Sequence, residues 1–401
     1  MNEWKKVKLG DCISTKKGFA FKSALYTNCG VPVVRVSDFT LDSVADNDLV
    51  YYPHAEKDRY DEYVLNEGDV LIQTVGSWQY NPNSVVGKVV RVPYYHKGSL
   101  LNQNIVKIIP NNGYNNAFIF YRLKCRDFAG HVLGEARGAA NQASITLDTI
   151  KRFSFDCPLL STQQRIATIL SRYDSLIENY RKQIKLLEEA AQRLYKEWFI
   201  DLRFPGHENT KIVDGVPEGW EKKKLHEIAE VVMGSSPKSE FYNNDKQGLP
   251  FHQGVGSYGT RFVDDNVYST SITRLAEPNS ILFSVRAPVG RLNITKNKII
   301  IGRGLAAMNH KDGFQSFLFY MLKERFFMDN IIGNGSIFAS ISKVELLDQE
   351  FIVPPMKTIK AFESLASKLD KKIQGVDTQL RLLTEARDRL LPKLMSGEIE
   401  I

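Results

Sequence analysis

Large apolar residues recur along two long stretches of the chain at alternating spacings of four and three positions. An average spacing of 3.5 residues is typical of a helix that packs one seam against another helix in a coiled coil. The seam of the first stretch is Ile166, Leu170, Tyr173, Ile177, Tyr180, Ile184, Leu187, Ala191, Leu194 and Trp198. The seam of the second is Phe362, Ala366, Leu369, Ile373, Val376, Leu380, Leu383, Arg387, Leu390 and Leu394. Arg387 and the nearby Gly375 are expected to weaken the second helix.

Prolines and a capping motif predict where the two helices begin and end. Pro158 precedes Ser161-Thr162-Gln163-Gln164, and a Ser-x-x-Gln pattern predicts a capping box at the start of the first helix. Pro205 is expected to lie beyond its end. The second helix follows Pro354, and Pro392 is expected to kink or end it near the C-terminus.

A long amphipathic helix cannot bury its seam alone, so each seam needs a partner. The strict 3.5-residue spacing favours packing of the two helices on each other, antiparallel and with a pseudo-twofold axis. The alternative is that each helix packs only on its own globular module. Helices of roughly 35–40 residues would form a rod about 55 Å long, at about 1.5 Å per residue.

The two helices belong to an internal repeat that includes the modules before them. At an offset of 216 residues, Trp4 aligns with Trp220 and Gly18 with Gly234. At an offset of 196 residues, residues 143–145 align with 339–341, and residues 183–194 align with 379–390. The change of offset means that the first module has 20 more residues in its interior. Matching ends and divergent middles predict a common scaffold that presents two different surfaces.

The modules are predicted to be α+β domains, because short strand-like runs alternate with turns and with one helical stretch each. The predicted strands are residues 31–36, 69–74, 88–92, 280–285 and 298–301, and the predicted helices are residues 117–128 and 315–328. We expect the domains to be residues 1–157, the first globular module; 158–204, the first long helix; 205–353, the second module with its leading linker; and 354–401, the second long helix.

Composition narrows the class of partner. The net charge of +7 and a pI near 9.0 favour a polyanion such as nucleic acid. A membrane surface is the other possible polyanion, but the chain has no basic amphipathic segment or lipidation motif to support it. The four cysteines, at 12, 29, 125 and 157, have no metal-type spacing, which favours reduced thiols in a soluble, cytoplasmic protein.

Several loops at corresponding places of the two modules carry side chains that read bases or hold phosphates. Arginine reads guanine, asparagine and glutamine read adenine, and lysine and serine commonly contact phosphates. For any single residue, an ordinary solvated loop is an equally good interpretation. The candidate DNA-binding residues are Lys22, Gln73, Thr74, Ser77, Trp78, Gln79, Asn102, Gln103, Asn104, Arg137, Asn141, Gln142, Lys238, Ser284, Arg286, Arg291, Arg303, Asn334 and Ser336.

Motifs for catalysis are missing from the sequence. It contains no phosphate-binding Gly-x4-Gly-Lys-Ser/Thr loop, no His-Glu-x-x-His metal helix and no nucleotide-cofactor fingerprint. Residues 81–84, Asn-Pro-Asn-Ser, lack the second proline and the aromatic residue of the amino-methyltransferase motif, so we interpret them as a turn. We therefore expect no catalytic residues, no metal site and no cofactor in this chain.

Taken together, these features resemble the specificity subunit of type I restriction-modification systems, along the whole chain. The resemblance rests on residues 4–11 and their repeat at 216–221, on 158–166, on 197–201 and on 390–399. Pro355-Met356-Lys357 departs from the pattern at the start of the second helix, which weakens its cap and puts partner docking there in doubt.

The resemblance implies two target-recognition domains, each reading one half of an interrupted double-stranded DNA site. It implies that the helices set the gap and dock two methyltransferase subunits, which restriction and translocase subunits join. S-adenosylmethionine, ATP and magnesium would belong to those partners. Two other classes remain open at this point: a stand-alone modification or nuclease enzyme with degenerate motifs, and a coiled-coil scaffold that binds only protein.

Overall fold

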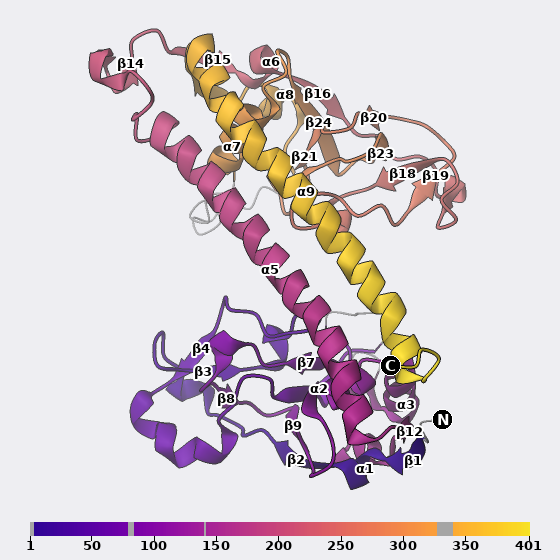
Figure 1. The fold of residues 1–401 in the computed structure, drawn as a ribbon. Coiled ribbons are helices and arrows are strands. Elements are labelled where there is room, and N and C mark those ends of the chain that lie inside the picture. Colours follow the sequence, from indigo (N-terminus) through magenta and orange to yellow (C-terminus); the bar gives the residue numbers. More distant parts are fainter. Residues whose placement is uncertain (1–3, 79–83, 140–141, 327–339) are drawn as a thin grey trace. The chain divides into compact units, whose positions relative to one another are not determined.

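The structure is a computed structural model, and it describes residues 4–78, 84–139, 142–326 and 340–401 (Figure 1). The chain divides into two compact units. Unit 1 contains Met1–Asn179 and Leu380–Ile401, and unit 2 contains Tyr180–Gln379. Each unit therefore holds one module together with about half of each long helix. The architecture is α+β, as predicted.

Unit 1 is built around a four-stranded antiparallel sheet with the order β2-β9-β5-β7. These strands are β2 (Ile13–Lys17), β9 (Ile105–Pro110), β5 (Val70–Gln73) and β7 (Val89–Arg91). Smaller sheets pair β1 (Lys5–Lys8) with β12 (Ser154–Cys157), β3 (Val31–Val34) with β4 (Val50–Tyr52) and β8 (Leu100–Leu101), and β11 (Gln142–Ser144) with β10 (Arg137–Ala139) and β6 (Val75–Gly76). The three strands predicted in this module are all present, each slightly shorter than its predicted range.

Short helices cover the sheet of unit 1. They are α1 (Leu9–Cys12), α2 (Asn116–Leu123), α3 (Arg126–Glu135) and α4 (Leu147–Arg152). The prediction of a single helix at residues 117–128 is wrong in one respect, because the helix is interrupted between α2 and α3. Cys125 has an extended backbone conformation, and its sulfhydryl donates to the carbonyl of Tyr121.

Unit 2 repeats this plan with a four-stranded antiparallel sheet in the order β16-β24-β21-β22. Its strands are β16 (Ala229–Met233), β24 (Leu305–His310), β21 (Ile281–Ser284) and β22 (Leu292–Ile294). A five-stranded sheet follows the order β17 (Tyr242–Asn243), β19 (Tyr268–Ser269), β18 (Leu249–His252), β23 (Ile299–Ile301) and β20 (Leu275–Ala276). The remaining pairs are β13 (Ile212–Val213) with β14 (Val216–Pro217), and β15 (Glu221–Lys224) with β25 (Glu350–Val353). The helices are α6 (Leu225–Ile228), α7 (Gln315–Phe326) and α8 (Lys343–Leu347).

The long helices are α5 (Leu160–Phe199) and α9 (Met356–Met395), and their predicted seams form the buried stripes. In unit 1, Ile166 and Leu170 near the start of α5 share a core with Leu394 near the end of α9. In unit 2 the opposite ends of the helices meet, since Ala191 near the end of α5 packs with Phe362 near the start of α9. The helices are therefore packed together and antiparallel, as predicted. The same clusters include module side chains, so each seam also packs on the module of its unit.

Two details of the long helices differ from their predictions, at the start of α5 and at Arg387. Helix α5 begins at Leu160, before the predicted capping serine, because the carbonyl of Leu159 accepts the first amide hydrogen bonds. Helix α9 runs through Pro392 and ends at Met395, three residues later. Arg387 is expected from the sequence to weaken the helix, but it is buried and its guanidinium donates hydrogen bonds to acidic groups of the module and of α5.

Candidate nucleic-acid interface

The candidate loops of unit 1 are joined by backbone hydrogen bonds around Thr74, directly after β5. The amide of Thr74 donates to the carbonyl of Asn104 across 2.8 Å, and the amide of Ile145 donates to the carbonyl of Thr74 across 2.9 Å. Thr74, directly after β5, is thereby bonded both to Asn104 and to Ile145, the residue that follows β11.

The loops of unit 2 use the same frame around Val285, directly after β21. The amide of Val285 donates to the carbonyl of Gly304 across 2.9 Å, and the amide of Ile341 donates to the carbonyl of Val285 across 2.9 Å. Thr74 and Asn104 in unit 1 thus correspond to Val285 and Gly304 in unit 2 in their backbone hydrogen bonds. The two modules therefore present equivalent loops on equivalent supports.

Two glycines that align in the repeat explain how the second of these loops is held. A β-carbon on Gly18 would lie 1.9 Å from the carbonyl oxygen of Asn102, and one on Gly234 would lie 2.1 Å from that of Gly302. No side chain fits at such distances, so glycine allows the backbone after β2 or β16 to touch the base of the loop.

The candidates differ in what their side chains can reach. The exposed ones are Lys22, Gln103, Arg137, Gln142, Lys238, Arg286 and Arg303, while Trp78, Asn104 and Arg291 are half-buried. The buried ones are Gln73, Thr74, Ser77, Asn102 and Ser284. Four candidates, Gln79, Asn141, Asn334 and Ser336, lie outside the described residues.

The buried candidates bond to the protein itself. The side-chain NH2 group of Gln73 donates to the backbone carbonyls of Val75 and Ser84, each across 2.9 Å. The hydroxyl of Ser284 donates to the carbonyl of Pro288 across 2.6 Å and accepts the amide of Arg291. These side chains hydrogen-bond within the loops, whereas the exposed candidates face solvent.

In unit 1 two of the exposed candidates, Arg137 and Gln142, lie on the small sheet of β6, β11 and β10. Arg137 pairs with Ser144, and Ala139 pairs with Gln142, across the β10–β11 hairpin. The indole of Trp78 donates to the carbonyl of Ala139 across 2.9 Å, which ties the 73–78 segment to this hairpin. The cation of Arg137, the side-chain amide of Gln142 and the ring of Trp78 therefore lie on or beside the β10–β11 hairpin.

In unit 2, Arg303 is held by two residues that the sequence did not single out. Its amide donates to the hydroxyl of Ser236 across 3.1 Å, and that hydroxyl donates to the amide oxygen of Gln253 across 2.9 Å. Gln253 is exposed beside Arg303, and it becomes a further candidate for base contact. The position of Ser236, two residues after the aligned Gly234, was the signal available in the sequence.

Below this loop, His252 occupies a serine–histidine–aspartate arrangement. Its Nδ1 lies 2.8 Å from the hydroxyl of Ser257, and its Nε2 lies 2.9 Å from a carboxylate oxygen of Asp265. Burial disfavours the charged form of Asp265, but His252 and Asn297 outweigh it and lower the carboxyl pKa. The ring is 1% exposed, and the His252 carbonyl accepts the amide of Gly302, so the arrangement supports the loop.

Loop length accounts for part of the difference between the modules. Gln73 and Gly87 share a backbone bond that encloses the first loop, and Ser284 and Gly290 share the equivalent bond. Fourteen positions separate the first pair and six separate the second. Eight of the 20 additional residues of the first module therefore lie in this loop.

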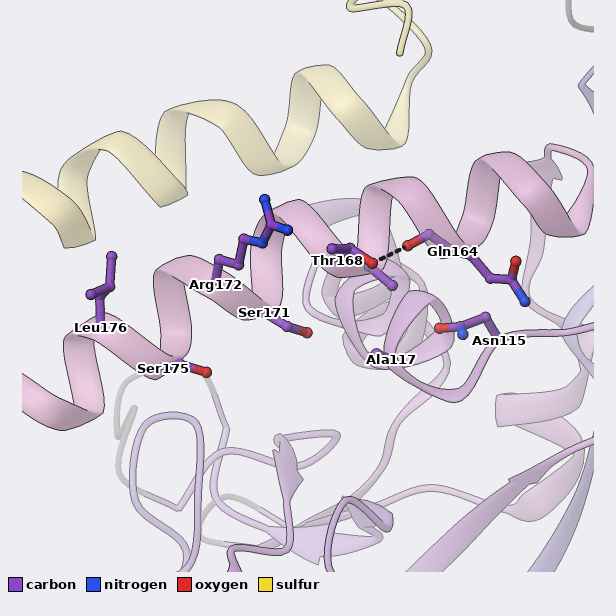
Figure 2. A pocket seen from close by; sticks show the side chains of 9 residues that line it. Asn115, Ala117, Gln164, Thr168, Ser171, Arg172, Ser175 and Leu176 are labelled. Carbon is purple, nitrogen blue, oxygen red and sulfur yellow. Dashed lines mark hydrogen bonds between the residues drawn. The ribbon is translucent and has the colours of Figure 1, made fainter.

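A shallow groove of about 890 Å³ follows one face of α5 in unit 1 (Figure 2). Figure 2 shows Asn115 and Ala117, at the start of α2, facing small polar side chains of α5 such as Ser171. None of the candidate DNA-binding residues is among the described residues that line it. The groove is therefore separate from the candidate interface.

Two further kinds of feature are absent from residues 4–78, 84–139, 142–326 and 340–401. Within these ranges, no three histidine, cysteine or acidic side chains gather as they would around a metal ion. No helix in the same ranges is both long and apolar enough to cross a membrane. The thiol of Cys157 is buried near Cys12, which raises its pKa to about 12.

Duplicated modules with loops rich in arginine and amides, held on two antiparallel helices, define a target-recognition protein for DNA. The family described as the type I restriction modification DNA specificity domain matches residues 1–189 and 217–380. The chain belongs to this family of type I restriction-modification specificity subunits, which determine the DNA target and are not catalytic. It is thus a component of a type I restriction-modification complex.

Relatives and solved structures agree with this assignment. The chain is 28% identical over 381 residues to the putative type I restriction enzyme MjaX specificity subunit of Methanocaldococcus jannaschii, covering 93% of this chain and 88% of the relative. It is 30% identical over 318 residues to the MjaIX specificity subunit of the same organism, covering 75% and 73%. The fold is similar to the crystal structure of the S subunit from M. genitalium, with a TM-score of 0.58, 17% identity and coverage of 98% and 96%.

Proposed function

We propose that each module reads one half of an interrupted double-stranded DNA site through the exposed residues of its loops. The observation that carries this proposal is the shared frame around Thr74 and Val285, which supports loops of different length and composition. A common frame gives both modules the same mode of docking. Different loops give them different base preferences.

The experiment is genome-wide methylation mapping of the complex reconstituted with its methyltransferase subunits, using Arg137→Ala and Arg286→Ala. We expect each substitution to relax one half-site only, at a cost of about 1–3 kcal/mol at the affected base pair. Lys6→Ala and Lys222→Ala are matched controls, because these exposed lysines are repeat equivalents on β1 and β15, outside the loops. Unchanged DNA affinity and target preference in both arginine variants would contradict the assignment of the loops.

We infer that the long helices act as the ruler between the two half-sites. Each helix has 40 residues. At about 1.5 Å per residue this is roughly 60 Å, the length of about 17–18 base pairs at ~3.4 Å each. The family relationship supports this role, and a helix of fixed length suits a site whose two halves are separated by a constant gap.

We also propose that the helices dock two copies of the methyltransferase subunit, which restriction and translocase subunits then join. Leu186 and Leu382 are repeat equivalents, and each is 53% exposed. Each belongs to an identical Leu-x-x-Glu-Ala-x-x-Arg pattern whose four residues share one helical face. The two faces consist of Leu186, Glu189, Ala190 and Arg193, and of Leu382, Glu385, Ala386 and Arg389. Two identical solvent-facing surfaces favour two copies of one partner.

Stoichiometry by native mass spectrometry tests this docking. We expect Leu186→Glu and Leu382→Glu each to remove one methyltransferase subunit, and the double variant to remove both. Ile212→Glu is the control, because Ile212 is 58% exposed and belongs to β13 rather than to a long helix. Retention of two subunits by the double variant would contradict the assignment of these faces.

A further inference from the structure

Three acidic residues form a column along α9 in unit 2. Glu363, Asp370 and Asp377 are spaced by seven residues, and each directly follows a residue of the seam. A seven-residue spacing places them on one side of the helix, next to the seam. All three receive hydrogen bonds or ion pairs from the module of the same unit.

The donors to this column come from three parts of the module. The backbone amides of Ser316 and Phe317, in the first turn of α7, donate to the carboxylate of Glu363. Arg261 and Tyr320 both donate to Oδ1 of Asp370, each across 2.7 Å. The ammonium group of Lys296 bonds to Asp377. The module is thus attached to α9 over two heptads.

Arg261 is the central group of this attachment. It is 3% exposed, and its guanidinium lies 3.5 Å from the centre of the Phe319 ring. Its second nitrogen, Nη1, lies 3.7 Å from Glu188 on α5, so one module side chain reaches both long helices. Burial raises the pKa of the Glu188 carboxyl, although Arg261 and Lys323 partly offset this effect.

Unit 1 has a corresponding attachment in which the arginine comes from the helix instead. Arg387 on α9 donates to Asp174 on α5 across 2.9 Å and to Asp42 of the module across 3.2 Å. Tyr121 on α2 donates to the other oxygen of Asp174 across 2.5 Å. Burial opposes ionisation of Asp42, but Lys124 and Arg387 outweigh it and lower the pKa.

The two attachments share a pair of equivalent residues. Residues 120–124 and 319–323 share the sequence Phe-Tyr-x-Leu-Lys, in which Tyr121 and Tyr320 occupy the same place. Asp174 and Asp370 are 196 residues apart, the offset of the repeated helices. We name the group of Asp42, Tyr121, Asp174 and Arg387 the first latch. We name the group of Glu188, Arg261, Tyr320 and Asp370 the second latch.

We propose that the two latches are positioning devices that fix the tilt of each module on the helices, and thereby the gap at which DNA is accepted. Buried ion pairs add little net stability but require one geometry, so they suit orientation better than strength. A tilt of roughly 10° moves a point ~20 Å from its pivot by about 3.5 Å, close to one base-pair step. The helical residues between the latches would then define the ruler.

This inference rests on the proposed reading of an interrupted site, so its test uses the gap as the readout. The reconstituted methyltransferase complex is offered a set of duplexes in which the two native half-sites are separated by the native gap, or by one base pair more or less. The variants are Tyr121→Phe and Tyr320→Phe, which remove only a hydroxyl, and Arg387→Met and Arg261→Met. Arg381→Gln and Lys371→Gln are controls, because both side chains are exposed on α9.

We expect the latch variants to raise methylation at the altered gaps, relative to the native gap, by at least tenfold over wild type, with unchanged half-site sequences. The controls should keep the wild-type ratio. Gap ratios that stay at the wild-type value in the two tyrosine variants, which keep their packing, would overturn the inference and leave the proposed function standing. A wild-type complex without any gap preference would overturn the proposed function itself.

Discussion

The guanidinium of Arg387 lies 2.9 Å from the carboxylate of Asp174, on the other long helix, inside the seam of unit 1. The two residues are 213 positions apart in the sequence, and Asp42 of the module completes the group. Together with Tyr121 and Lys124 they line a cavity of about 810 Å³. A charged residue is therefore tolerated in an apolar seam because acidic partners meet it there.

Removing one member of this group is expected to destabilise the protein. Asp174→Asn or Arg387→Gln should each lower the free energy of unfolding by ~3 kcal/mol, because a buried charge loses its partner. The double substitution should cost less than the sum of the single ones. Denaturant unfolding measures all three, and strictly additive costs would contradict the pairing.

Arg387 also shows what sequence reasoning could and could not reach. Periodicity encodes burial directly, so the two seams, the helices and their antiparallel packing could all be predicted. The partners of Arg387 could not, because Asp42 is 345 positions away and no local pattern connects them. The loops pose the same difficulty, since their hydrophobic and polar positions do not recur at a regular spacing. Polar residues such as Gln73 and Ser284 were found, but which of them face inward depends on tertiary contacts.

The aligned glycines give a second prediction. Gly18→Ala and Gly234→Ala place a methyl group against a carbonyl oxygen, so each should displace the supported loop and cost ~2 kcal/mol or more. The loss should be accompanied by a changed half-site for the affected module only. Gly130→Ala in α3 is the control, because a β-carbon there would have no atom within 4 Å beyond its chain neighbours and the backbone of its own helix. This substitution should stabilise the helix by up to ~1 kcal/mol.

Thermal unfolding and methylation mapping of these glycine variants check the prediction together. Half-sites that stay unchanged in a folded Gly18→Ala protein would show that the 102–104 loop does not read DNA. Destabilisation by Gly130→Ala would instead point to a general intolerance of alanine.

An insertion in α5 tests the ruler. Four residues added between Asp174 and Glu188 lengthen the stretch between the latches by about 6 Å and rotate it by only roughly 40°. We expect a wider gap between unchanged half-sites. The same insertion beyond Glu188, near the end of α5, should leave the gap unchanged while weakening packing in unit 2. Methylated-site mapping distinguishes the outcomes, and altered half-sites at the old gap would contradict the ruler.

Glu363 predicts how unit 2 responds to pH. Burial raises its carboxyl pKa above the usual value, although the amides of Phe317 and Ser316 partly offset this. A raised pKa in the folded state means that Glu363 favours folding most at low pH, and that this contribution is lost as the pH rises through the folded pKa. The two amides donate to separate oxygens of Glu363, so Glu363→Gln keeps an acceptor for one amide, loses the acceptor for the other and removes the titration.

The thermal stability of the Glu363→Gln variant relative to wild type should therefore rise between pH 4 and pH 7, by a few degrees (~2 °C for about 1 kcal/mol). This relative stability should be lowest near pH 4, where the wild-type carboxyl is protonated. Ser364 is exposed beside it, so Ser364→Ala controls for a change in the same helical turn. Melting curves between pH 4 and pH 7 are the measurement. A larger gain at pH 4 than at pH 7 would show that the hydrogen bonds accepted by the ionised carboxylate outweigh the cost of burying its charge.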